Sequence, residues 1–238
     1  MYLMIIAAVL PAVLLGLYIW RKDPHPEPVK WVLRAFFLGV GICLPVAFLE
    51  NFISTLLFGA GGEPVTLFGS TIQAFFVAAL PEEGAKLFVL WLLLRRCPHF
   101  DEHFDGIVYA VFISLGFATL ENVAYVMTSG EAWMATAIMR AFLAVPGHYA
   151  FAIMMGYYYA VYHFVDHSKG IAAKMFLVPF LAHGVYDAIA MSGSVNPIAG
   201  SICVLVLVYF CVKLQKEASR KVQDLIAQNE NAGTDSIR

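Results

Sequence analysis

The sequence predicts an all-α protein, a polytopic transmembrane helix bundle of about seven spans. Hydrophobic residues make up 61% of its 238 residues and charged residues only 13%, with a mean hydropathy of +0.75. Soluble domains usually contain about 25% charged residues. A hydrocarbon core about 30 Å thick needs about 20 helical residues per crossing. Segments of that length lie near residues 2–20, 31–58, 67–94, 106–127, 134–162, 173–192 and 197–213.

The basic residues indicate how these spans are oriented. Lysines and arginines gather in the first, third and fifth connections and after the last span, and the bias toward positive cytoplasmic loops then places the N-terminus outside and the C-terminus in the cytoplasm. The first segment has no basic start and no small-residue cleavage site, so we expect a retained anchor. The basic residues concerned are Arg21, Lys22, Lys30, Arg34, Arg95, Arg96, Lys169, Lys174, Lys213, Lys216, Arg220 and Lys221.

We expect a single transmembrane domain, residues 1–213, followed by a cytoplasmic amphipathic helix and a disordered tail, residues 214–238. The formal net charge of −2 gives no general basic face, so nucleic acid is not an expected partner and the lipid bilayer is. The four cysteines lie in or beside apolar segments without zinc-site spacing, and we expect them to be reduced packing residues.

The third span carries an unusual group of charges: Glu82, Glu83 and Lys86, directly after Pro81. An ionised side chain at the centre of a bilayer costs roughly 2.5–3.5 kcal/mol, so these groups should face the protein interior. The spacings i,i+4 and i,i+3 allow Lys86 to approach either carboxylate, while the two carboxylates point about 100° apart. Pro81 removes a backbone hydrogen bond and predicts a local kink. Two roles remain open, an acid and base pair or a structural ion pair.

Three other spans place polar residues at similar depth. Glu121 and Asn122 lie in the outer half of the fourth span, His148 near the middle of the fifth and His183 near the middle of the sixth. Asp187 follows His183 by one helical turn on the same face. Four helices are therefore expected to offer acid, amide and imidazole groups to one interior.

Some polar residues have more ordinary interpretations. Arg140 is expected to reach the membrane interface or to pair with Glu121. The Leu-Glu-Asn sequence ending at Asn51 repeats the one ending at Asn122, which is weak evidence of a duplication. Two loop clusters resemble metal sites, but we expect both to be solvated loops: His99, Asp101, Glu102, His103 and Asp105, and then His163, Asp166 and His167.

Four short motifs, taken together and in order, resemble those of the PrsW family of intramembrane proteases. They are Glu82-Glu83-Gly84-Ala85-Lys86, Phe117 to Asn122, Pro146-Gly147-His148, and His183 to Asp187. That family is in turn similar to the CAAX prenyl-endopeptidase and bacteriocin-processing superfamily. The resemblance implies a multi-pass endopeptidase of a bacterial plasma membrane that cleaves a membrane-anchored protein. For this family the substrate would typically be a single-span anti-sigma factor in a stress response.

The resemblance and the residue chemistry together predict a mechanism. One glutamate of Glu82 and Glu83 would take a proton from the attacking water. His183 and His148, with Asn122, would hold that water or donate hydrogen bonds to the oxyanion. Lys86 would keep the second glutamate ionised, and Asp187 would orient His183.

Alternatives stay open at this point. In a zinc-dependent form, His148, His183 and Glu121 would bind Zn²⁺ and Glu82 or Glu83 would be the base. We favour the metal-free form and expect no cofactor. Midplane ionisable residues are also typical of a proton-coupled transporter, and a non-catalytic membrane scaffold would use them to hold helices together.

Overall fold

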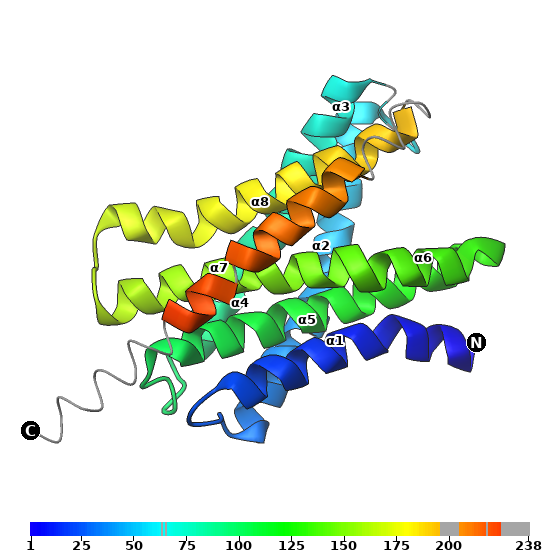
Figure 1. Ribbon diagram of the computed structural model, residues 1–238. Helices are drawn as coiled ribbons and strands as arrows, with labels where there is room; N and C mark the ends of the chain where they lie inside the picture. The colour runs from blue at the N-terminus through cyan, green and yellow to red at the C-terminus, as the bar shows by residue number, and fades with distance from the viewer. Residues whose placement is uncertain (63, 65, 196–204, 218, 225–238) are drawn as a thin grey trace, which may run out of the picture.

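The computed structural model describes residues 1–62, 64, 66–195, 205–217 and 219–224, and within these ranges it contains helices and no strands, which confirms the all-α class (Figure 1). The first half of the chain forms α1 (Tyr2–Lys22), α2 (Val29–Phe58), α3 (Leu67–Ile72), the π-helical η1 (Gln73–Ala79) and α4 (Leu80–Leu94). The second half forms α5 (His103–Thr128), η2 (Gly130–Ala132), α6 (Trp133–Met139), the π-helical η3 (Arg140–Ala144), α7 (Val145–Phe164) and α8 (Lys169–Val195).

Within the described residues, five helical segments are long and apolar enough to cross a membrane: α1, α2, α5, the continuous run Gly130–Phe164, and most of α8. The third expected span is present as the uninterrupted helical run of α3, η1 and α4, whose π-helical middle divides it into shorter pieces. The seventh expected span begins in residues outside the described ranges, and residues 205–217 continue it as a helix. The structure thus agrees with the predicted positions of the helices.

The helix α5 lies at the centre of the bundle. About 67% of its most apolar stretch is buried, against 22–28% for the corresponding stretches of α1, α2 and α8. Glycines allow the neighbouring helices to approach it closely, as is common where membrane helices cross. A Cβ at Gly39 of α2 would meet the backbone of Ile113, and one at Gly156 of α7 would meet the backbone of Gly106. The outward faces of α1 and α2 carry many exposed large hydrophobic residues, as expected for a surface in contact with lipid.

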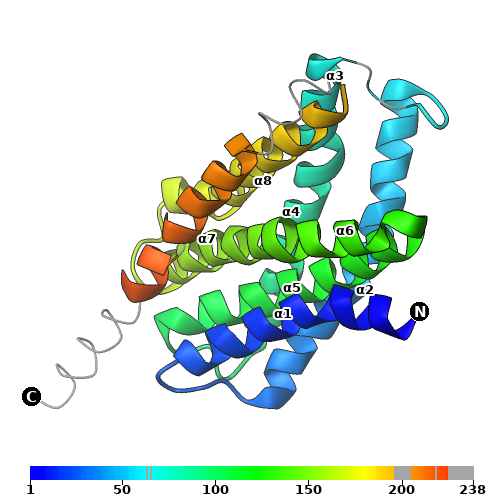
Figure 2. The same cartoon turned by 45° about the vertical axis from the view of Figure 1, so that its right-hand side comes forward.

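The basic connections share one end of the bundle. In Figures 1 and 2 the α1–α2, α4–α5 and α7–α8 connections lie at one end of the bundle, and the last described helix, residues 219–224, ends there too. The N-terminus lies at the opposite end. Successive long helices run in alternate directions between these two ends. The sorting of lysines and arginines in the sequence therefore corresponds to a real end of the molecule.

The described part of the carboxyl-terminal segment is helical and packs its apolar side on the bundle. Residues 205–217 and 219–224 are helical, and Leu214 and Val222 are buried in the main hydrophobic core. The side chain of Gln215 donates a hydrogen bond to the carbonyl of Pro146 at 2.5 Å. The apolar face of this segment therefore covers α7. The expected disordered tail lies outside the described residues.

Candidate active site

The distortion expected at Pro81 takes the form of a π-helical segment. The N–H of Leu80 donates to the carbonyl of Phe75, five residues back, at the end of η1. A proline ring collides with the carbonyl four residues before it, and a wider turn relieves that collision. The segment η3 (Arg140–Ala144) precedes Pro146 in the same way. The two π-helical segments each lead into a helix that carries candidate site residues.

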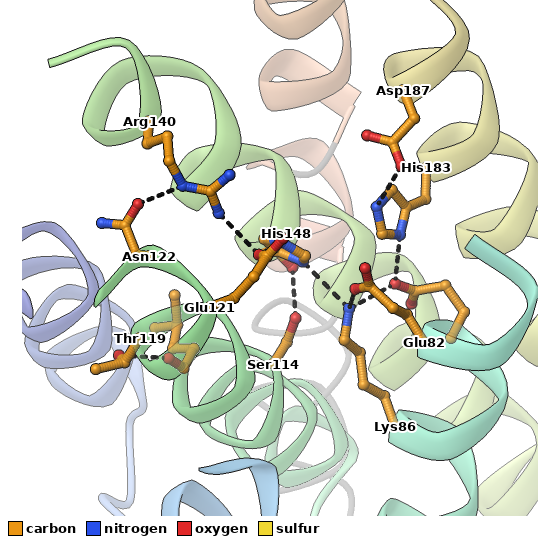
Figure 3. Close-up of polar contacts among 12 residues, drawn as sticks. Glu82, Lys86, Ser114, Thr119, Glu121, Asn122, Arg140, His148, His183 and Asp187 are labelled. Carbon is orange, nitrogen blue, oxygen red and sulfur yellow. Dashed lines mark hydrogen bonds and ion pairs between the residues drawn. The ribbon is translucent and has the colours of Figure 1, made fainter. Parts of the chain in front are cut away.

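Lys86 connects the acid pair to the first histidine. Its Nζ lies 2.8 Å from Glu82 Oε2, 2.8 Å from Glu83 Oε1 and 3.1 Å from His148 Nδ1 (Figure 3). An ammonium group has three protons to donate and cannot accept. His148 Nδ1 must therefore be the acceptor, which leaves Nε2–H to donate to Glu121 Oε2 at 3.0 Å. This chain of contacts fixes the tautomer of His148.

His183 lies between two carboxylates. Its Nδ1 is 2.9 Å from Glu83 Oε1 and its Nε2 is 3.3 Å from Asp187 Oδ2, one helical turn further along α8. The ring of Phe151 stacks on its face with a centroid separation of 4.8 Å, and the ring of His148 meets it edge-on at 5.3 Å. Both ring nitrogens are therefore engaged, and both orientation and position of this imidazole are held by neighbouring groups.

Glu121 joins this centre to a second cation. The Arg140 guanidinium donates from Nη2 to Glu121 Oε2 at 2.8 Å and from Nε to Asn122 Oδ1 at 2.5 Å. Asn122 Nδ2 donates in turn to the carbonyl of Ala8 at 2.6 Å. The expected Arg140–Glu121 pair is confirmed. The Asn122 amide therefore positions Arg140, and Asn122 is fully buried. Its expected part in holding water stays a prediction.

A cavity of about 470 Å³ opens beside these groups, within the size range of enzyme and ligand sites. Three of the sequence-predicted residues do not line the cavity: Glu83, Lys86 and Asn122. The structure therefore separates the acid pair, since Glu82 faces the cavity and Glu83 does not. The sequence-predicted residues that line it are Glu82, Glu121, His148, His183 and Asp187.

Glu50 of α2 also lines the cavity and was not among the predicted site residues. One of its carboxylate oxygens, Oε1, is buried and has no hydrogen-bond partner in the described part of the chain. The signal that could have found it is the Leu-Glu-Asn repeat, because Glu50 and Glu121 hold the same position in that motif. Both glutamates face the same cavity.

One donor set in this region has the composition of a metal site. Single donor atoms of Glu82, His148 and His183 all lie within 4.8 Å of one another, and all three residues are buried. Two imidazoles and a carboxylate are a donor set that suits Zn²⁺, with further coordination positions left open toward a cavity. Glu121 was expected in this set, but the structure places Glu82 there instead. The Lys86 ammonium contacts two of these three residues, Glu82 at 2.8 Å and His148 at 3.1 Å.

The two loop clusters have different outcomes. His163, Asp166 and His167 are exposed, as the solvated-loop interpretation expects. In the other cluster Asp105 is only 1% exposed. The prediction of a solvated loop is therefore wrong for Asp105, because the start of α5 is covered by the α1–α2 connection.

The fold and the cavity define the class of protein: a multi-pass membrane protein whose ionisable groups gather around a cavity between its helices. The profile of the family described as PrsW family intramembrane metalloprotease matches residues 27–214. The Protease PrsW of Geobacillus kaustophilus is 39% identical over 189 residues, covering 79% of each chain. That of Oceanobacillus iheyensis is 40% identical over 185 residues, covering 77% of this chain and 80% of the relative.

The Protease PrsW of Bacillus subtilis is 36% identical over 192 residues, covering 79% of this chain and 83% of the relative. No solved structure matches the chain. The chain belongs to the PrsW family, and it is a multi-pass membrane protease. This membership favours the protease over the transporter and the scaffold.

Proposed function

We propose that this protein hydrolyses a peptide bond of a membrane-anchored protein, with Glu82 as the general base. One observation carries the assignment of the base. Glu82 lines the cavity with His148 and His183, whereas Glu83 is fully buried behind them. A general base must reach the water that it activates. Glu83 then acts as a positioning residue, through Lys86 on one side and His183 on the other.

In this mechanism Glu82 takes a proton from a water molecule as the water oxygen attacks the scissile carbonyl. The same carboxyl then delivers the proton to the leaving amine. His183 shares its Nε2–H, which makes only the longer 3.3 Å contact with Asp187, with the developing oxyanion, and Glu83 holds the ring through Nδ1 at 2.9 Å. Lys86 keeps Glu82 fixed in orientation, and the Arg140–Glu121 pair closes the opposite wall. The paired-glutamate and two-histidine plan supports a relationship to the CAAX prenyl-endopeptidase and bacteriocin-processing superfamily.

The convergence of Glu82, His148 and His183 supports a second form of the same activity, a zinc-dependent one. These three residues would hold the ion, and a bound Zn²⁺ would supply a Lewis acid for the carbonyl and lower the pKa of water. Glu82 would then be a ligand, which leaves Glu121 as a carboxylate facing the cavity. We favour the metal-free form because the Lys86 ammonium already neutralises Glu82 at 2.8 Å.

The substrate we propose is a single-span anti-sigma factor cleaved during a stress response. The support is the resemblance of the ordered motifs to the PrsW family. We also propose that the end with the basic connections faces the cytoplasm, in line with the positive charge of those connections. That orientation puts Glu121 and Arg140 nearer the outer face, where a clipped extracytoplasmic segment would enter.

A cleavage assay on a single-span reporter tests the assignment of the base. Purified Glu82→Gln protein in lipid discs is expected to lose about 10²–10⁴-fold in cleavage rate. Glu83→Gln should retain more activity, because it removes a positioning group and not the base. Glu131→Gln, at an exposed site on η2, is the matched control. Wild-type cleavage by folded Glu82→Gln would overturn the proposal.

The metal question needs a separate measurement. Elemental analysis of active protein, with cleavage measured after chelation and dialysis, distinguishes the two forms. Full activity at less than one zinc per ten molecules supports the metal-free mechanism. Activity that falls with the metal content and returns on adding Zn²⁺ supports the zinc form. His148→Ala should abolish zinc binding in that second case.

A further inference from the structure

A second group of carboxylates lies away from the cavity, at the end of the bundle that carries the basic connections. Asp23 and Glu27 come from the α1–α2 connection, and Glu102 and Asp105 come from the start of α5. Asp23 and Glu27 are each 4% exposed and Asp105 is 1% exposed. Buried carboxylates need a compensating charge, a proton or strong hydrogen bonds.

Hydrogen bonds satisfy only part of this group. Asp105 Oδ2 accepts from the backbone N–H of Asp101 at 3.0 Å and of Glu102 at 2.7 Å, which caps α5. The phenol of Tyr109 donates to Glu27, and the Glu27 and Asp105 carboxyls are themselves hydrogen-bonded. Two carboxyls can share a hydrogen bond only when one of them holds a proton. These contacts bind the α1–α2 connection to α5, and Glu102 adds an ion pair with His25 at 2.8 Å. The charge of the remaining carboxylates, above all that of Asp23, has no such partner among the described residues.

The Asp23 side chain is the least satisfied. Its Oδ1 accepts the backbone N–H of His25 at 3.0 Å, while its buried Oδ2 has no hydrogen-bond partner. Within the described residues, no lysine or arginine forms an ion pair with Asp23, Glu27 or Asp105. Burial, together with the negative charges of Glu27 and Glu102, raises the pKa of Asp23 to about 6. A buried carboxylate oxygen without a donor indicates a missing cationic partner.

The spacing of the oxygens suits a single ion. One carboxylate oxygen each of Asp23, Glu102 and Asp105 lies within 4.8 Å of the other two. Calcium binds oxygen at about 2.3–2.6 Å and magnesium at about 2.0–2.1 Å, so two oxygens on one ion are at most about 5 Å or 4 Å apart respectively. These oxygens can therefore share a Ca²⁺ ion with little movement. Carboxylate oxygens are also the ligands that hard cations prefer.

We propose that Asp23, Glu102 and Asp105 bind a hard divalent cation, with Ca²⁺ the best fit. The ion would fasten the connection after α1 to the first turn of α5, the central helix of the bundle. Glu27, which is hydrogen-bonded to Asp105, adds a further acidic group next to the proposed ion. This site is separate from the cavity and does not depend on the proposed proteolytic mechanism.

Terbium luminescence tests this site directly. Tb³⁺ replaces Ca²⁺ at oxygen sites and emits when a nearby aromatic ring absorbs, and two such rings contact Glu27. Tyr109 donates to its carboxylate, and Trp20 donates to its carbonyl at 3.0 Å. Full-length protein in detergent should show sensitised Tb³⁺ emission that saturates at one ion per protein molecule. Adding Ca²⁺ should reverse the emission, and parallel titrations with Mg²⁺ and Mn²⁺ compare how well each ion displaces Tb³⁺.

Two variants connect the signal to these residues. Asp23→Asn keeps the acceptor for the His25 N–H and removes the charge, and it should weaken Tb³⁺ and Ca²⁺ binding at least about tenfold. Glu102→Gln should do the same, and it decides the question if Asp23→Asn does not fold. Glu131→Gln, also a single lost carboxylate, should bind like wild type.

Further outcomes separate this site from its competitors. His148→Ala should leave the Tb³⁺ signal unchanged, because that residue belongs to the cavity. Wild-type affinity in both Asp23→Asn and Glu102→Gln would overturn the proposal. So would a wild-type protein that gives no emission and whose thermal unfolding is unaffected by millimolar Ca²⁺, Mg²⁺ or Mn²⁺. In that case protons alone compensate the buried carboxylates.

Discussion

Replacing Gly39 with alanine should force α2 away from α5, whereas the same replacement at Gly41 should be harmless. A Cβ at Gly39 would lie 1.9 Å from the carbonyl oxygen of Ile113, while nothing lies within 4 Å of a Cβ at Gly41. Both glycines are interior residues of α2, two positions apart. The pair therefore isolates the effect of the helix contact.

The size of the effect follows from two terms. Alanine favours a helix interior over glycine by about 0.8–1.0 kcal/mol, and both variants gain this. An ordinary contact of Cβ with a heavy atom begins near 3.4 Å, so the Gly39 variant must separate two backbones by about 1.5 Å. Overpacking costs about 1–3 kcal/mol. We expect the upper end, about 3 kcal/mol, because a backbone carbonyl cannot rotate away like a side chain.

Equilibrium unfolding in mixed micelles, followed by circular dichroism, measures both variants against wild type. Gly41→Ala should be as stable as wild type or more stable, and Gly39→Ala should be less stable than Gly41→Ala by about 3 kcal/mol. The reciprocal contact offers a second test, since a Cβ at Gly116 would lie 2.0 Å from the Phe36 carbonyl oxygen. Equal stability of the Gly39 and Gly41 variants would refute the reasoning about close helix contact.

Three other predictions concern named groups. Lys86→Met should lower the free energy of unfolding by about 3–5 kcal/mol, because it leaves two buried carboxylates without their cation. Adding Glu83→Gln should restore part of this lost stability. A loss below about 1 kcal/mol would contradict the reasoning. Asp187→Asn should lower the cleavage rate about tenfold or more by releasing the His183 ring, with no change in unfolding free energy, and an unchanged rate would exclude the positioning role. Burial raises the pKa of the Cys97 thiol, so maleimide labelling at pH 8, read by peptide mass spectrometry, should be slow in folded protein and rapid after unfolding; equal rates would show that the thiol is accessible.

Contacts within one helix were predictable because helical geometry alone determines them. The spacings of Glu82 and Glu83 from Lys86 predicted that Lys86 could approach either carboxylate, and both contacts are present at 2.8 Å. The spacing of His183 and Asp187 likewise placed them on one face, where they lie 3.3 Å apart. The convergence of different helices on one interior followed from the cost of placing charges in lipid.

Contacts between distant parts of the chain were not predictable in the same way. Glu27 and Tyr109 meet across 82 positions of sequence, through a loop whose path no periodicity reveals. The direction of the Asn122 amide depends on the position of Ala8 in α1. Glu50 lines the cavity because of how α2 packs on α5, where Gly39 lies directly against the backbone of Ile113. Such features depend on tertiary packing, which one sequence does not specify by pattern alone.

The π-helical segment η1 also affects how this chain aligns with its relatives. A π-helical turn holds one residue more than an α-helical turn between the same neighbours. Deleting one residue between 73 and 79 would leave Glu82 and Lys86 four positions apart on one face. The π-helical turn would become an α-helical turn between the same neighbours, so α3 would keep its orientation relative to α4 and its contact with α8. A one-residue alignment gap here would therefore leave the motifs downstream in register.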